Sequence, residues 1–377
     1  MRRTGDGSDL RVDTIGSLLR PGVLVDAFTQ ADAGRLDEAA LQSIQDEAIE
    51  QVIAEQEKRG LPVLTDGEFR RRHFMESFSD VSGFDHGRLA PLGVAVITDE
   101  VAAPSGDGAM AHGYLERAAV VEPLRLARNQ VLEEFTFAQS RTDRVVKASL
   151  INPGRIVEAY DEEASRGVYE DVDEFVAAVV AVQRQMVGGV VDAGCRYVHI
   201  DAPGYTAYVD RDSREAMANP DASLERAIGA DNAVMQGFDG VTFGLHMCRG
   251  NFRGRWAREG AYDDYAEVTE RIYTELRHQR LMLEYDSDRA VGFDSLRFVP
   301  AGKIAVLGLI STKSQRLETV DELQRRVEAA SRFLPLEQLA ISPQCGFGSV
   351  LDGNPLDEDT QWRKLEVMMK AADRIWA

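Results

Sequence analysis

The segment VDEFVAAVVAVQRQMVGGVVDAGCRYVHID, residues 172–201, contains the pattern that decides the fold. Its first part, Val172–Ala193, has apolar residues at spacings of three and four, which is typical of an amphipathic helix. The short run Tyr197–Ile200 follows, is mostly aliphatic and aromatic, and ends at a polar residue, so it predicts a buried strand. A helix followed by a buried strand is the repeating unit of a parallel sheet that helices cover.

The same unit recurs along most of the chain. Short apolar runs predict eight strands: Val12–Ile15, Leu61–Leu64, Val145–Ser149, Tyr197–Ile200, Val241–Leu245, Leu281–Leu283, Ile304–Leu309 and Leu339–Ile341. Helical patterns accompany them: Glu38–Lys58, Val172–Ala193, Leu224–Met235, Tyr262–His278, Val320–Phe333 and Thr360–Ile375. Eight strands with mostly intervening helices favour a (β/α)8 barrel of the TIM type. No glycine-rich nucleotide loop follows the first strand, which disfavours an open dinucleotide-binding sheet.

The stretch of approximately residues 84–142 breaks this rhythm. It contains glycine-rich turns, a predicted hairpin over Val94–Val101 and a polar helical pattern over Glu122–Ser140. We therefore expect an insertion between the second and third barrel strands. Because no internal repeat, low-complexity tract or long linker is visible, the sequence predicts a single barrel domain over residues 1–377.

Composition excludes several classes of partner. The chain has 43 Lys and Arg against 63 Asp and Glu, a net charge of −20, and this field repels phosphate backbones and anionic lipid. The longest purely apolar runs, such as Phe175–Val182, are shorter than the roughly 20 residues of a membrane-spanning helix. No apolar stretch follows the basic N-terminus, so we expect a cytoplasmic protein that binds neither nucleic acid nor membrane. Three cysteines are too few and too scattered for a disulfide framework.

Polar side chains closely follow several predicted strands. In a parallel barrel, the carboxyl ends of the strands and the loops after them form the open mouth where catalytic residues gather. His246 and Cys248 follow the fifth strand and project to the same side, because side chains alternate along an extended segment. Glu284 ends the sixth strand and Cys345 follows the eighth. We expect barrel closure to bring these four side chains to one mouth.

Two thiolates, one imidazole and one carboxylate form a tetrahedral set that suits zinc. Such an electron-rich zinc is a weak Lewis acid, but it still binds an incoming thiol as thiolate. The set therefore favours sulfur alkylation, in which the bound thiolate attacks an electrophilic carbon. Other interpretations stay open at this point. A His-x-Cys pair at a strand end also fits core packing, Cys345 alone fits a small buried apolar residue, and a non-enzymatic barrel with a closed structural zinc is conceivable.

The motifs around these residues resemble the cobalamin-independent methionine synthase family. The matching segments are Thr-Ile-Gly-Ser (14–17), Thr-Asp-Gly-Glu (65–68), His-Ile-Asp-Ala-Pro (199–203), His-Met-Cys-Arg-Gly-Asn (246–251), Leu-Glu-Tyr-Asp (283–286), Gly-Leu-Ile-Ser-Thr-Lys (308–313) and Ser-Pro-Gln-Cys-Gly-Phe (342–347). The resemblance implies a zinc-binding catalytic barrel with His246, Cys248, Glu284 and Cys345 as ligands. It also implies that Glu284 is the ligand that yields when the substrate thiol arrives.

Two reactions stay open within this resemblance. Full-length methionine synthases have a second, N-terminal barrel that helps to hold a polyglutamyl folate, and this chain has no room for it. The family's Asp-Glu-Pro motif is here Asp201-Ala202-Pro203. In length and single-barrel build the chain is similar to the epoxyalkane:coenzyme M transferases, lyases in which the zinc-bound coenzyme M thiolate opens an aliphatic epoxide to give 2-hydroxyalkyl-coenzyme M. We therefore expect this reaction first, and methyl transfer from a methyl carrier to homocysteine as the alternative.

The two reactions would use different substrate-binding residues. A sulfonate needs cations or N–H donors, and four arginines follow two of the predicted ligands: Arg249, Arg253, Arg255 and Arg258. These arginines can equally pair with surface Asp and Glu. The ammonium of homocysteine would instead be held by Glu68 and Asp201, as their counterparts do in the family, although both carboxylates can also pair with nearby arginines.

Three further expectations concern the acid group of the substrate, the proton donor and the assembly. Ser17 can donate to the acid group of either thiol substrate, or can simply be a turn residue after Gly16. The candidate proton donors lie beside the expected barrel-mouth loops: His73, Tyr205 and Tyr208. A homo-oligomer is compatible with a barrel of this kind, but no exposed apolar stripe in the sequence specifies one.

Overall fold

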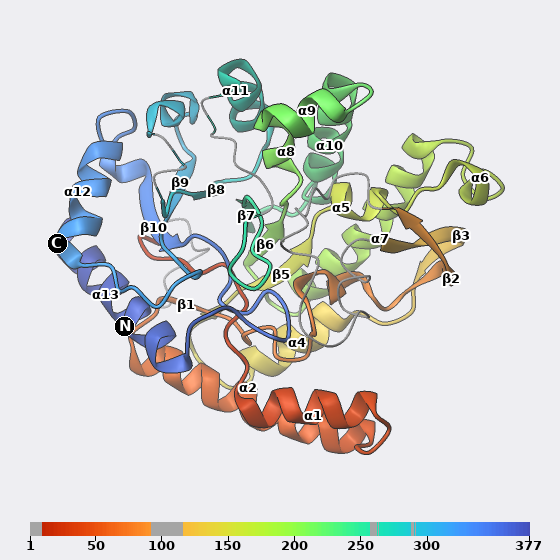
Figure 1. The fold of residues 1–377 in the computed structure, drawn as a ribbon, viewed down its shortest axis with the longest axis horizontal. Coiled ribbons are helices and arrows are strands. Elements are labelled where there is room, and N and C mark those ends of the chain that lie inside the picture. The colour runs from red at the N-terminus through yellow and green to blue at the C-terminus, as the bar shows by residue number, and fades with distance from the viewer. Residues whose placement is uncertain (1–9, 92–115, 257–261, 263, 288–289, 291) are drawn as a thin grey trace.

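A computed structural model of the protein describes residues 10–91, 116–256, 262, 264–287, 290 and 292–377. Helices surround a parallel sheet that curves into a barrel (Figure 1). Six neighbouring strands form the larger part of it in the order β10-β9-β8-β7-β6-β5. Their bounds are Ala148–Ile151 (β5), Tyr197–Asp201 (β6), Thr242–Met247 (β7), Arg280–Glu284 (β8), Ile304–Ile310 (β9) and Leu339–Pro343 (β10). Every pairing in this sheet is parallel, and the predicted (β/α)8 fold is confirmed.

Short contacts complete the barrel. β1 (Val63–Leu64) pairs in parallel with β4 (Val145–Val146), and the Lys147 N–H donates to the Leu64 carbonyl at 3.1 Å as the chain enters β5. The first predicted strand is reduced to one parallel bridge between Val12 and Ile341 of β10. Each of the eight predicted strand positions therefore takes part in the barrel, although the seam on either side of the first segment has little regular backbone pairing.

The helices cover the outside of this sheet. The longer ones are Gly22–Asp32 (α1), Glu38–Lys58 (α2), Gln130–Gln139 (α4), Val172–Asp192 (α7), Pro220–Val234 (α10), Ala266–Glu275 (α11), Val320–Ala330 (α12) and Glu358–Ile375 (α13). Short helices near the strand ends are Phe74–Phe78 (η1), Pro153–Val157 (α5), Glu162–Ser165 (α6), Tyr205–Val209 (α8), Arg211–Ala216 (α9), Asp294–Phe298 (η3) and Leu336–Gln338 (η4). All six predicted helical patterns correspond to helices here, with ends that differ by a few residues, whereas α1, α5, α6, α8 and α9 had not been predicted.

An antiparallel hairpin projects from one side of the barrel (Figure 1). It consists of β2 (Val81–Pro91) and β3 (Glu116–Leu126), and the predicted hairpin over Val94–Val101 lies outside the described residues. The predicted helix over Glu122–Ser140 starts too early, because β3 continues to Leu126 and the helix α4 begins only after Asn129, whose side chain accepts the Leu132 N–H at 3.2 Å. The assignment of this segment as an insertion within a single domain stays a prediction.

Helix α7 is the one described helix that is long and apolar enough to cross a membrane. Half of its most apolar stretch is buried inside the protein, and it packs against α10, α5 and α4. The Asp171 side chain accepts the N–H groups of Asp173 and Glu174 and so begins the helix. Its apolar residues are therefore explained by packing against the other elements of the barrel.

Side-chain alternation along the strands fills the barrel interior in layers. A small apolar layer is formed by Ile15, Met282, Val306 and Ala340. A second group consists of charged and aromatic side chains: Lys147 Nζ lies 2.9 Å from Asp13 Oδ1, Arg280 Nε lies 3.1 Å from Asp13 Oδ2, and the Tyr197 hydroxyl donates to the same Oδ2 at 2.6 Å. Burial by itself would raise the pKa of Asp13, but Lys147 and Arg280 hold it below its usual value. Asp13 is therefore the buried anion around which these cations are arranged.

Candidate metal centre

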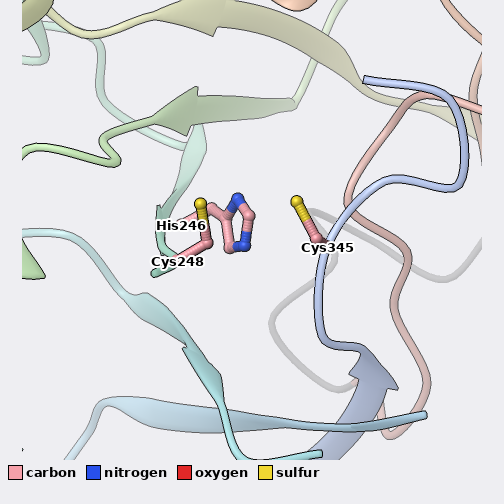
Figure 2. A group of neighbouring side chains, drawn as sticks. All are labelled: His246, Cys248 and Cys345. Atoms are coloured by element: carbon pink, nitrogen blue, oxygen red, sulfur yellow. The ribbon is translucent and has the colours of Figure 1, made fainter. Parts of the chain in front are cut away.

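Three potential metal ligands meet at the carboxyl ends of β7 and β10. His246 points into the barrel from the end of β7, Cys248 follows it, and Cys345 lies in the loop after β10 (Figure 2). All three are buried, and their ligand atoms lie within 4.8 Å of one another. Figure 2 shows the Cys345 sulfur directed toward the other two side chains from the opposite side. Side chains that are about 100 residues apart in sequence are thus brought together by barrel closure.

The two thiols share a hydrogen bond. Cys248 donates to Cys345, which lowers the pKa of Cys345 to about 6. The same bond, together with burial, raises the pKa of Cys248 well above its usual value. Two sulfurs and one imidazole within this distance form a soft, nitrogen- and sulfur-rich donor set, which suits zinc better than magnesium or calcium.

Glu284 lies at the edge of this group. Among the described residues, the group within 4.8 Å comprises His246, Cys248 and Cys345 without Glu284. The Glu284 carboxylate accepts the backbone N–H of Arg249 at 2.9 Å and the Trp256 indole N–H at 3.0 Å, and Lys313 Nζ lies 3.5 Å away. Burial alone would raise the pKa of Glu284, but Lys313 and Arg249 hold it below its usual value. The carboxylate is therefore ionised next to the group, and its role as fourth ligand stays a prediction.

Asp201 orients the imidazole of His246. Asp201 Oδ1 lies 2.9 Å from His246 Nδ1 and 3.2 Å from His199 Nε2. Burial alone would raise the pKa of Asp201, but the two imidazoles hold it below its usual value, so the carboxylate only accepts. His246 therefore has a proton on Nδ1 and presents Nε2, now 3.1 Å from the Gln344 carbonyl, toward the side of Cys345. His199, Asp201 and His246 also lie within 4.8 Å of one another. Because the two groups share His246, we interpret His199 and Asp201 as residues that hold His246 in place, and not as a second metal site.

Glu68 and Asp201 form a pair of interacting carboxylates. Burial, together with the nearby Asp201 charge, raises the pKa of Glu68 to about 8 against the opposing effect of Arg71. Arg71 Nη1 lies 3.7 Å from Glu68 Oε1, while Glu68 Oε2 is buried without a hydrogen-bond partner. A side chain at Gly16 would approach Glu68 Oε1 to 2.9 Å, so Glu68 lies tightly against the first segment. The Asp201 charge disfavours ionisation of Glu68, and a cation bound between the two side chains would relieve this effect.

The predicted arginine cluster does not converge on the His246/Cys248/Cys345 group. The buried Arg249 guanidinium lies 5.0 Å over the Tyr262 ring. Arg253 is partly exposed and lies 3.9 Å from Asp352, and the backbone of Arg255 pairs with that of Phe252. Arg258 lies outside the described residues. The guanidinium nitrogens of Arg249 are buried without a hydrogen-bond partner, and their charge acts on Glu284. A sulfonate-binding role for these arginines stays a prediction.

The candidate proton donors have other partners. The Tyr205 hydroxyl donates to Asp231 at 2.6 Å, and burial raises its pKa well above the usual value. Burial raises the pKa of Tyr208 to about 12, so this phenol is a poor acid as well. His73 Nε2 lies 3.8 Å from Glu76 Oε1. A proton-donating role for any of the three stays a prediction.

Three residues near the group had not been assigned a role: His199, Trp256 and Lys313. His199 precedes Asp201 by two residues on β6, so strand periodicity places both on the inner face and gives a signal that is visible in the sequence. Lys313 follows β9, whose carboxyl end also faces the barrel mouth. Trp256 lies in an irregular loop, and no sequence pattern indicates its contact with Glu284.

Arg20 ties two loops of the barrel mouth together. Its buried guanidinium donates to the carbonyls of Glu68 and Arg71 after β1, each at 3.0 Å. It also donates to the carbonyls of Gly348 at 2.7 Å and Val350 at 3.2 Å, in the loop that contains Cys345. One cation thus fixes the turn with Glu68 relative to the loop with a predicted metal ligand.

We expect Gly348→Ala to disturb this junction. A Cβ at Gly348 would lie 2.4 Å from the Leu18 carbonyl oxygen, a backbone atom that cannot rotate away, and 3.2 Å from Arg20 Nη1. The variant should lose about 1–3 kcal/mol of unfolding free energy, measured by urea denaturation, because the loop has to move. Gly229→Ala is the matched control, since nothing lies within 4 Å of its added Cβ in α10. Equal stability of Gly348→Ala and the wild type would contradict the packing described for this loop.

Comparison with known proteins places this site in a family. The model of the cobalamin-independent synthase catalytic domain matches residues 12–373. The chain belongs to this family. The Bacillus subtilis protein YxjH is 32% identical over 97% of this chain and 94% of its own length. The methionine synthase of Pyrococcus abyssi is 26% identical over 96% of this chain and 91% of its own. The solved structure of a B12-independent methionine synthase from Shewanella, in complex with selenomethionine, has a TM-score of 0.75 at 18% identity and covers 97% of this chain and 98% of that chain.

These findings confirm the family resemblance and correct one inference from chain length. Single-barrel size was a reason to expect an epoxyalkane:coenzyme M transferase before a methionine synthase. The Pyrococcus protein is named a methionine synthase, yet this chain spans 91% of its length. Length therefore does not separate the two reactions, and the named methionine synthases favour the alternative over the epoxide reaction.

Proposed function

We propose that the protein is a zinc-dependent methyltransferase that moves a methyl group from a methyl carrier to the thiol of homocysteine. The observation that carries this proposal is the Glu68 and Asp201 carboxylate pair beside the His246/Cys248/Cys345 group. A cation site next to a thiolate-binding site fits an amino thiol, with its ammonium at the carboxylates and its sulfur at the metal. The names of relatives such as the Pyrococcus methionine synthase support the same reaction.

The donor set fits zinc, and different residues of the chain would bind the metal and the substrate. His246, Cys248 and Cys345 would hold the ion, and Glu284 would be the fourth ligand. Bound zinc supplies the Lewis acidity that keeps the substrate sulfur deprotonated near neutral pH. Glu68 and Asp201 would orient the ammonium, and the buried Ser17 would donate to the carboxylate. The substrate thiol releases its proton on binding. The C–S bond then forms as the bond between the methyl group and its carrier breaks, and the electron pair of that bond stays with the carrier.

The same geometry disfavours coenzyme M. Its sulfonate is an anion, and beside Glu68 and Asp201 it would face carboxylates. None of the relatives named above supports an epoxide as the alkyl donor.

A panel of thiols and alkyl donors tests the proposal. Zinc-loaded protein would be incubated with homocysteine, 4-mercaptobutyrate or coenzyme M, each with methyltetrahydrofolate, a methyl corrinoid or epoxypropane. We expect methylation of homocysteine by one of the methyl donors, with 4-mercaptobutyrate at least about tenfold less efficient because it lacks the ammonium. Consumption of epoxypropane with coenzyme M, and none of homocysteine with any methyl donor, would overturn the proposal.

Zinc binding should release protons. Without metal near pH 7, Cys248 is protonated, because the hydrogen bond to Cys345 and burial raise its pKa well above the usual value. Coordination requires the thiolate, so zinc displaces this proton, and its apparent affinity should rise about tenfold per pH unit for each proton released. Calorimetry in buffers of different ionisation enthalpy counts the protons. Zinc affinity that is independent of pH between 6 and 8 would contradict this.

A further inference from the structure

His199 occupies a position between the charged cluster of the barrel interior and the candidate metal centre. It is fully buried on β6, on the same inner face as Tyr197 and Asp201. Its Nε2 lies 3.2 Å from Asp201 Oδ1, the oxygen that also accepts from His246 Nδ1 at 2.9 Å. Two imidazoles thus converge on one oxygen of a single carboxylate.

We propose that His199 is a positioning residue that fixes Asp201 so that its two oxygens have separate tasks. Oδ1, held by His199, keeps the ring of His246 oriented for the metal. Oδ2 takes part in neither of these hydrogen bonds, and the Asp201 side chain retains 10% exposure, so this oxygen is left for the ammonium of the substrate. The substrate half of this inference rests on the proposed function, whereas the metal half does not.

The environment of His199 supports a specific role over simple packing. Its Nδ1 is buried without a hydrogen-bond partner, which costs free energy that an apolar side chain of similar size would not cost. The hydrogen bond from Nε2 to Asp201 is the interaction that offsets this cost. A purely space-filling side chain would not require an imidazole with this orientation.

The surrounding charges show what His199 prevents. Lys147 is a buried cation whose charge acts on both His199 and Asp201, and its ammonium is bound to Asp13 in the interior cluster. Without the bond from His199, the Asp201 carboxylate is drawn toward this ammonium and away from His246. His199 therefore separates the interior ion pairs from the carboxylate that serves the metal centre.

The test compares His199→Leu, which removes the donor, with His199→Gln, whose longer amide can still reach Asp201. Zinc affinity is measured by competition with a chromophoric chelator, and KM is measured for homocysteine and for 4-mercaptobutyrate. We expect His199→Leu to bind zinc about 10- to 100-fold more weakly, the range typical for loss of a partner that orients a metal ligand. KM for homocysteine should rise while KM for 4-mercaptobutyrate stays unchanged, and His199→Gln should restore most of both losses.

His278→Leu is the matched control, because His278 is also a fully buried histidine, packed on the Phe243 ring with centroids 6.5 Å apart. It should change neither zinc affinity nor the KM ratio. If His199→Leu does not fold, His199→Asn replaces it, since its shorter amide falls short of Asp201. Wild-type zinc affinity and KM ratio in the donor-less variant would overturn the inference. Inactivity of the wild type toward homocysteine would instead overturn the proposed function and leave the zinc measurement decisive for His199.

Discussion

Cys345→Ala is expected to lose zinc and methyl transfer together. The substitution removes one of two sulfurs from a buried group of three ligand atoms within 4.8 Å. Because a structural or catalytic zinc site depends on each of its few ligands, affinity should fall roughly a thousandfold, below what survives dialysis against a chelator. Cys248→Ala should behave in the same way. Metal content by atomic spectroscopy and turnover by the appearance of the methylated thiol measure the two losses.

The third cysteine of the chain provides the control for this prediction. Cys195 is buried, and its thiol donates to the Tyr197 carbonyl at 3.1 Å, outside the His246/Cys248/Cys345 group. Cys195→Ala should keep full zinc content and activity, and lose about 1 kcal/mol of unfolding free energy with its hydrogen bond and packing. A Cys345→Ala protein that retains one zinc per chain would refute the ligand assignment.

Asp13→Ala is expected to be the most destabilising of the substitutions considered. Asp13 is fully buried and faces Lys147 at 2.9 Å and Arg280 at 3.1 Å. The substitution removes the negative charge around which these two buried cations are arranged, so the unfolding free energy should fall by about 3–5 kcal/mol. Urea denaturation followed by circular dichroism measures the change.

An exposed ion pair gives the comparison for Asp13. Glu275 and Arg271 are partly exposed at the end of α11, with the charged atoms 3.0 Å apart. Glu275→Ala should change the unfolding free energy by less than about 0.5 kcal/mol, because solvent screens such pairs. If Asp13→Ala is no less stable than Glu275→Ala, the interior charge cluster does not hold the barrel together in the way proposed.

Most of the fold could be predicted because buried strands and amphipathic helices leave strong periodic patterns. The run Tyr197–Ile200 is buried on both faces, and α7 presents an apolar stripe, so both are visible in the sequence. The part of the barrel formed by its first two strand positions was harder to predict, since Val12 contributes a single bridge and β1 has two residues. The hairpin strands β2 and β3 were not predicted, because long-range pairing, and not local periodicity, decides their conformation.

The candidate site was predictable where it depends on strand ends and unpredictable where it depends on loop conformation. His246 lies near the end of β7, Cys248 follows that strand and Cys345 follows β10, so the topology of the barrel is sufficient to bring them together. The contact of Glu284 with Trp256 depends on an irregular loop that no pattern describes. Clustering in sequence does not fix where a guanidinium points, so a substrate-binding role for the arginines stays a prediction.

The hydrogen bonds by which Arg20 links two loops have a consequence for redesign of the protein. One guanidinium joins the carbonyls of Glu68 and Arg71 to those of Gly348 and Val350, so the two loops are held at a fixed distance from each other. A directed-evolution campaign for new thiol acceptors should leave these hydrogen bonds intact and diversify the segments after β6 and β8. Libraries that randomise Arg20 would mostly separate the turn with Glu68 from the loop with Cys345 instead of altering selectivity.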